Sequence, residues 1–251
     1  MINDLNIILA SNPFIDAYIA SDWMGKLIFI GLIMLSIISW ILIAHKGWIT
    51  YLARKNSMQF YKAFESQRTN PLGIESTSSS RHNRPNPFFN LYFALKKYTL
   101  EILNKNRHFG QQQGATTDGL ISYMSPTDVD FVQSHLMVAM TKQVKYLEKN
   151  LFILATIVSL APFLGLLGTV WGILTTFSEL QTQTGGTHNV VLGGISLALA
   201  TTVLGLVDAI PALIGYNYLK NSVRDFQVEM EEFSNELLAS VEIYYRKVDV
   251  S

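Results

Sequence analysis

The sequence predicts an all-α membrane protein with three transmembrane helices and long cytoplasmic helical extensions. Only 15% of its 251 residues are charged, whereas a soluble domain would carry about a quarter. The charged residues are absent from three long windows, which is the distribution expected of a membrane protein. The basic residues gather between the first and second windows and after the third.

Each of the three windows is long enough to cross a bilayer. Leu27 to Ala44 has 18 residues, about 27 Å of α-helix, which just suffices for the hydrocarbon core. Leu151 to Ser178 has 28 residues and no charge, and Asn189 to Lys220 is uncharged before its final lysine except for Asp208. Each window must be helical because lipid offers the backbone no hydrogen-bond partner. The predicted spans are 27–44, 151–177 and 190–218.

The basic residues predict the orientation. There are 14 Lys or Arg between Lys46 and Lys149, and four from Lys220 onwards. The stretch 179–188 has none, and only Lys26 precedes the first span. The positive-inside rule places the basic segments in the cytoplasm. We therefore expect the segments 1–26 and 178–189 outside the cytoplasm, and the segments 45–150 and 219–251 inside it.

The segment 45–150 divides into a linker and two helices. Residues 69–87 are rich in Pro, Ser and Asn and indicate a flexible linker. Residues 88–109 show the apolar spacing of an amphipathic helix. A second helix is predicted to start at Thr127, with Asp130 as an acidic variant of the capping box. Its apolar pattern runs on to Asn150, which predicts one long helix entering the bilayer there.

The C-terminal segment also has a helical pattern. Apolar residues recur every three or four positions from Val223 to Tyr244, with an acidic run between them. The acidic run is typical of a solvated helix face, or it pairs with the basic helices of a neighbouring subunit. One copy has too few partners to bury these apolar stripes, so we expect an oligomer.

Small residues mark the second and third spans. Gly168 and Gly172 form a GxxxG pattern, a spacing that lets membrane helices approach closely, and Pro162 predicts a kink. The further residues that we assign to helix packing or kinking are Gly165, Gly194, Gly205 and Pro211.

Three polar side chains inside the spans are candidates for a mechanism. The ordinary interpretation of Thr169 and Thr202 is a hydroxyl bonded back to its own helix. For Asp208 it is a position near the headgroups. A carboxylate within a span is nevertheless costly and usually marks a pathway or a pair.

These motifs carry a family resemblance. Ala161 to Ile173 (APFLGLLGTVWGI) resembles the second-helix signature of the TolQ/ExbB/MotA proton-channel family, and Ala200 to Asn217 (ATTVLGLVDAIPALIGYN) is similar to its third-helix signature. Residues 128–218 resemble the family closely and the rest loosely. Within the family, Leu35–Ile41 and Met230–Phe233 are more similar to the TolQ branch than to ExbB.

The resemblance implies a bacterial inner-membrane homo-oligomer, a pentamer in the family, with its N-terminus in the periplasm. The second and third helices would line a pore around single-span helices of a TolR- or ExbD-type partner. The proton motive force would be passed to a TolA- or TonB-type protein, for envelope integrity, cell division or transport. Thr169 and Thr202 match the family's pore threonines, and Thr201 and Asp208 complete the predicted proton pathway.

One position departs from the family pattern. Leu197 stands where the family usually has a glutamate. Asp208 lies 11 residues later, on the same helix face within about 20° and roughly 16 Å along the axis. The carboxylate is therefore predicted to have moved along that face.

Other functions find less support in the residues. With no cysteine and five scattered histidines, neither an enzyme nor a metal or other cofactor is expected, and a neutral net charge gives no reason to expect nucleic acid. The alternatives to a TolQ-type motor subunit are an ExbB-type subunit of a TonB complex and a non-conducting membrane scaffold.

Overall fold

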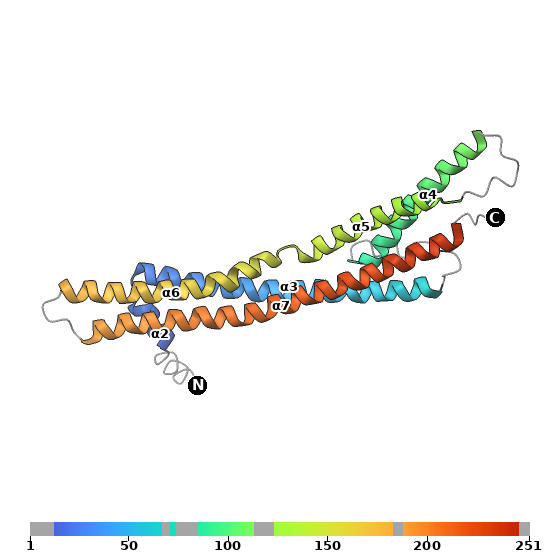
Figure 1. Cartoon of the computed structure of the whole chain (residues 1–251). Coiled ribbons are helices and arrows are strands. Elements are labelled where there is room, and N and C mark those ends of the chain that lie inside the picture. Colours follow the sequence, from blue (N-terminus) through green and yellow to red (C-terminus); the bar gives the residue numbers. More distant parts are fainter. Residues whose placement is uncertain (1–12, 67–70, 74–84, 113–122, 183–187, 246–251) are drawn as a thin grey trace. The chain divides into compact units, whose positions relative to one another are not determined.

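The computed structural model describes residues 13–66, 71–73, 85–112, 123–182 and 188–245 (Figure 1). These residues are helical apart from short turns and caps, and they contain no β-strand. The helices are α2 (Pro13–Ala20), α3 (Trp23–Ser66), α4 (Pro87–Gln112), α5 (Pro126–Glu148), α6 (Leu151–Thr182) and α7 (His188–Tyr245).

The predicted class of an all-α membrane protein is confirmed, because three helical stretches are long and apolar enough to cross a membrane. They extend beyond the predicted spans: α6 reaches Thr182 and α7 begins at His188, both inside the expected loop 178–189. Hydropathy predicts the part of a helix that lipid surrounds. It does not predict where the helix ends, since amphipathic packing continues a helix in water.

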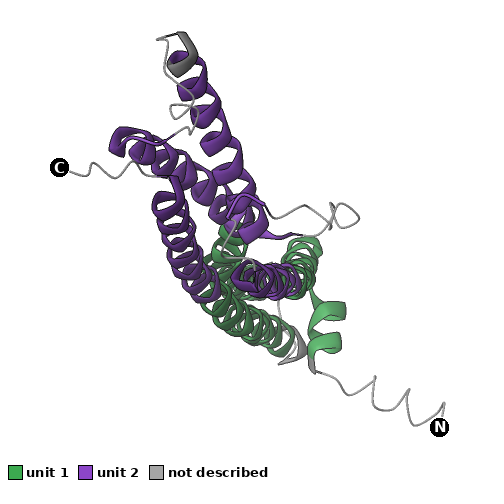
Figure 2. Cartoon of the chain, turned by 90° about the vertical axis from the view of Figure 1, so that its right-hand side faces the viewer, with its two compact units in different colours: residues 1–45, 150–219 green, residues 46–149, 220–251 purple. Residues whose placement is uncertain are grey.

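The described chain forms two compact units (Figure 2). The first contains residues 1–45 and 150–219 and includes all three predicted spans. Its interior is mostly apolar: Ile28 and Leu32 of α3 pack with Ala161 of α6 and Ala209 of α7. Large apolar side chains cover its outside, including Phe163 and Leu199, each more than 60% exposed. Such a surface suits lipid or another membrane helix.

The second unit contains residues 46–149 and 220–251. Its core is aromatic. The rings of Phe88 and Phe233 stack with centroids 4.3 Å apart, and Phe64 meets Phe233 edge-on. Leu95 of α4 and Leu136 of α5 are fully buried, and Met124 donates its N–H to the Tyr245 carbonyl oxygen at 2.7 Å. The apolar stripes predicted for these segments therefore pack against one another within one chain, and the expectation that a single copy has too few partners to bury them is wrong.

The start of α5 differs from the prediction. The N-cap is Ser125, followed by Pro126, and the capping box pairs Ser125 with Asp128 in place of Thr127 with Asp130. The Asp128 N–H donates to the Ser125 hydroxyl at 3.2 Å, and the Ser125 N–H donates to the Asp128 carboxylate at 2.9 Å. Proline favours the first helical position because it needs no N–H partner there. The Ser125-Pro126 pair therefore sets the start of α5, and Thr127 does not cap it.

The Asp128 carboxylate is well stabilised in its charged form. Partial burial raises its pKa, but hydrogen bonds from Ser125 and Asn106, together with the nearby Lys105 charge, outweigh burial and hold the pKa below its ordinary value. The Asn106 amide donates to it at 3.1 Å and also donates to the Tyr123 carbonyl at 3.0 Å. The cap thus joins the start of α5 to α4.

The predicted continuous helix through Asn150 is wrong. α5 ends at Glu148 and α6 begins at Leu151. Asn150 lies between them with a positive φ of 71°, a left-handed conformation that asparagine tolerates better than most residues. The buried Lys46 ammonium donates to the Leu147 carbonyl at 3.3 Å. It therefore satisfies one of the carbonyls that the helix end leaves open.

Most of the predicted linker 69–87 lies outside the described residues. Of that stretch the structure describes only a turn at 71–73 and the residues from 85 onwards.

Candidate functional site

The two helices that carry the signature motifs touch backbone to backbone in the first unit. A Cβ atom added to Gly205 of α7 would lie 2.7 Å from the Ala161 carbonyl oxygen of α6, and one added to Gly172 would lie 2.8 Å from the Gly194 carbonyl oxygen. Real Cβ atoms essentially never approach a heavy atom closer than 3.0 Å. Only glycine fits these contacts, so small residues set the distance between the helices.

Two threonines fill the remaining space reciprocally. Thr201 of α7 lies directly over Gly168 of α6, and Thr176 of α6 lies directly over Gly194 of α7. Both threonines are buried and donate their hydroxyl hydrogens to carbonyls of their own helices. Thr176 was not among the predicted site residues, whereas Thr201 was assigned to the predicted proton pathway. In this structure Thr201 is fully buried between the two helices of one chain.

Thr169 and Thr202 are the polar residues of the predicted set that are only partly buried. The Thr169 hydroxyl donates to the Leu166 carbonyl of its own helix at 2.6 Å. The Thr202 hydroxyl crosses to α6 and donates to the Gly165 carbonyl at 3.3 Å. Gly165 and Thr169 are one turn apart and share a helix face. Both hydroxyl hydrogens are thus directed at carbonyls, and the oxygen lone pairs remain able to accept.

Asp208 faces α3 and is buried, with 5% of its surface exposed. The Ser39 hydroxyl lies 2.8 Å from the Ser36 carbonyl oxygen and 3.4 Å from Asp208 Oδ1, so its single hydrogen is shared between these two acceptors. Among the described residues, Asp208 Oδ2 has no hydrogen-bond partner. Leu197, on the same side of α7, packs against Phe29 and Ala17. The face on which the carboxylate was expected to move is therefore turned towards α3.

A second carboxylate joins the start of α3 to α6. Asp22 accepts from the Gly25 N–H at 2.8 Å and so caps the start of α3. Its other oxygen accepts from the Trp171 indole N–H of α6 at 2.8 Å. Sequence reasoning missed this contact, because the two residues are 149 positions apart and only folding brings them together.

The prolines do not interrupt their helices. Pro162 lies inside α6 and Pro211 lies inside α7, and both helices continue past them.

The helices that carry the signature motifs match a known protein family. Residues 108–232, from the end of α4 through most of α7, match the model of the MotA/TolQ/ExbB proton channel family. The chain belongs to this family. The match contains both signature helices and all the glycine contacts between them, whereas α2 and α3 lie outside it. The Asp208–Ser39 contact thus joins a residue of the family region to one beyond it.

Individual members of the MotA/TolQ/ExbB family are similar over most of the chain. The Tol-Pal system protein TolQ of Haemophilus influenzae is 29% identical over 224 residues, 89% of this chain and 91% of that protein. TolQ of Pseudomonas aeruginosa is 29% identical over 226 residues, 90% of each chain. The biopolymer transport protein ExbB of Aquifex aeolicus is 43% identical over 98 residues, 39% of this chain and 66% of that protein. Family membership and three apolar helices make this a multi-pass inner-membrane protein.

Proposed function

We propose that this chain is the channel-forming motor subunit of a proton-driven complex of the TolQ type. It would form a homo-oligomeric pore, with its N-terminus in the periplasm and its C-terminus in the cytoplasm. A single-span TolR- or ExbD-type partner would occupy the pore, and a TolA- or TonB-type protein would receive the energy. The observation that carries the proposal is the pair of partly exposed hydroxyls on the closely packed signature helices.

The hydrogen-bond geometry supports a role in proton transfer. Thr169 and Thr202 direct their hydrogens at carbonyls and keep lone pairs available. In this state they accept from a carboxylic acid, the protonated form of a partner aspartate. Rotation of either hydroxyl would allow it to donate to the carboxylate instead. The two threonine hydroxyls can therefore form a hydrogen bond with an aspartate side chain in both its protonated and its ionised form.

The TolQ-type assignment rests on identity over nearly the whole chain. The TolQ relatives are 29% identical over about nine-tenths of the chain, whereas an ExbB of similar coverage, 88% of this chain, is 26% identical. An ExbB-type role is the second candidate, since the ExbB of Aquifex aeolicus is 43% identical over a shorter stretch of 98 residues.

Proton flux in reconstituted liposomes tests the proposal. The chain is incorporated with a TolR-type or an ExbD-type partner, and acidification of the lumen is followed with a pH-sensitive dye. Flux with the TolR-type partner supports the proposal, and flux with the ExbD-type partner alone assigns the ExbB role. If neither partner gives proton flux in a correctly assembled complex, the chain is a non-conducting scaffold.

Alanine variants assign the flux to the two hydroxyls. Thr169→Ala and Thr202→Ala should each lower flux about tenfold or more, the value of a hydrogen bond to an ionisable group. Thr156→Ala is the matched control, because its hydroxyl is bonded back to the Phe152 carbonyl on an exposed part of the same α6. Equal flux in all three variants would contradict the assignment.

A further inference from the structure

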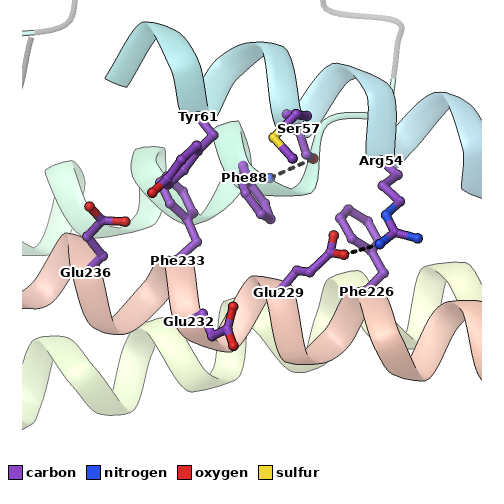
Figure 3. A pocket seen from close by; sticks show the side chains of 10 residues that line it. Arg54, Ser57, Tyr61, Phe88, Phe226, Glu229, Glu232, Phe233 and Glu236 are labelled. Carbon is purple, nitrogen blue, oxygen red and sulfur yellow. Dashed lines mark hydrogen bonds and ion pairs between the residues drawn. The ribbon is translucent and has the colours of Figure 1, made fainter. Parts of the chain in front are cut away.

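An acidic groove lies in the second unit between α3 and α7. It has a volume of about 340 Å³ (Figure 3). Phe88 and Phe233 form its apolar floor, and Arg54 and Glu229 make an ion pair at its edge. Glu232 and Glu236 of α7 add two more carboxylates. Arg54 is paired with Glu229, whereas Glu232 has no ion pair with any described residue and makes this part of the groove acidic.

A basic and apolar face lies on α5 of the same unit. Ser134, Met137, Val138, Thr141, Lys142 and Lys145 line a shallow hollow there. Met137 and Val138 are 58% and 54% exposed, although α5 is otherwise amphipathic. By helix periodicity this face is opposite the buried residues Val132, Leu136 and Leu147. Its two lysines give it a formal charge of +2, and neither forms an ion pair with the described part of the chain.

We propose that the α5 face of one subunit docks into the α3–α7 groove of a second copy of this chain. The proposal rests on the oligomeric function above and names the contact that would join the subunits. A closed ring is built from head-to-tail contacts, which need two different and complementary surfaces on every chain. The groove and the α5 face are two such surfaces, and both are open in a single copy.

The two surfaces match in charge. Glu232 in the groove is the acidic partner expected for Lys142 of the α5 face, and Lys145 lies three residues, about 4.5 Å, further along α5. An ion pair between Glu232 and Lys142 can therefore form. Met137 and Val138 would at the same time cover Met58, which lines the groove and is 53% exposed. Burial of these apolar groups supplies affinity, while the charges select the register.

Cross-linking between two distinguishable copies tests the contact. The chain has no cysteine, so Lys142→Cys is placed in one tagged copy and Glu232→Cys in another, and both are co-expressed at full length. A short bismaleimide is used, because a Lys–Glu pair holds its Cα atoms farther apart than a disulfide spans. Glu231→Cys is the matched control, since it is exposed on α7 about 100° away from Glu232.

The proposal predicts a cross-link between the two tags for 142 with 232 that exceeds the 142 with 231 product severalfold. Charge reversal adds a second measurement. Glu232→Lys alone should lower the cross-link that reports the interface, from positions 138 and 58, about two- to fivefold, and Lys142→Glu in the same chain should restore it.

Equal cross-linking at 232 and 231, or no rescue by the double reversal, would overturn this docking. The mass of the solubilised complex separates the two possible failures. An oligomer without the cross-link refutes the contact and leaves the proposed function standing, whereas a monomer refutes both.

Discussion

Replacing Gly205 with alanine tests whether backbone contact between α6 and α7 holds the first unit together. The new Cβ would lie 2.7 Å from the Ala161 carbonyl oxygen and 3.2 Å from the Gly165 Cα. Both are backbone atoms that no side-chain rotation can move, so the helices must separate. Overpacking costs about 1–3 kcal/mol, and the higher helix propensity of alanine offsets about 1 kcal/mol at most. We expect a net loss of about 1–2 kcal/mol.

Gly31→Ala is the matched control for this experiment. Gly31 lies in the first predicted span, and a Cβ there would meet nothing within 4 Å. The two variants are purified in detergent and unfolded by heating, with circular dichroism as the signal. At about 2–4 °C per kcal/mol for a chain of this length, Gly205→Ala should unfold about 2–8 °C below the wild type. Gly31→Ala should unfold with the wild type or up to about 4 °C above it, because it gains helix propensity without a clash. If both variants unfold with the wild type, the close contact does not stabilise the unit.

The remaining predictions concern the Asp208 carboxylate, the cap of α5 and the membrane topology. Asp208→Asn keeps the shape of the side chain and should lower proton flux while the complex still assembles; unchanged flux at normal yield would show that the carboxylate is structural. Ser125→Ala should lower stability by about 1 kcal/mol, measured by thermal unfolding. The lowered pKa of Asp128 stabilises the fold above its ordinary pKa, and this contribution should fade as pH falls below about 3.8. Asp128→Asn should lose less stability between pH 6 and pH 3 than the wild type does. For topology, a cysteine at Ser11 should react with an impermeant maleimide in intact cells and one at Ser251 should not; labelling of both would reverse the proposed orientation of one terminus.

Hydropathy and spacing were sufficient for the fold class, because lipid leaves the backbone only the helix. They were insufficient at Asn150, where the apolar pattern of α5 continues without a gap into α6. The break depends on one residue in a left-handed conformation, and a pattern of apolar positions carries no information about φ. The cap at Ser125 could have been found, since Ser-Pro followed by an acid satisfies both the first-position and capping preferences.

The candidate site was predictable in part. The small residues and the two partly exposed threonines stand within recognisable motifs. The partner of Asp208 was not predictable, since Ser39 lies 169 residues away and nothing in the first span marks it. Thr176 was missed for a different reason: its role is defined by the absence of a side chain at Gly194, which only packing reveals.

The glycine contacts between α6 and α7 also restrict how a pore could change its shape. Because the interlocking is made by backbone atoms and two buried threonines, neither helix can turn about its axis without collision. Helices α6 and α7 therefore move together as one rigid body. A movement that changes the surroundings of Thr169 must therefore carry Thr202 with it. In the proposed pore, any opening would then occur at the boundary with another subunit or with the occupant of the pore.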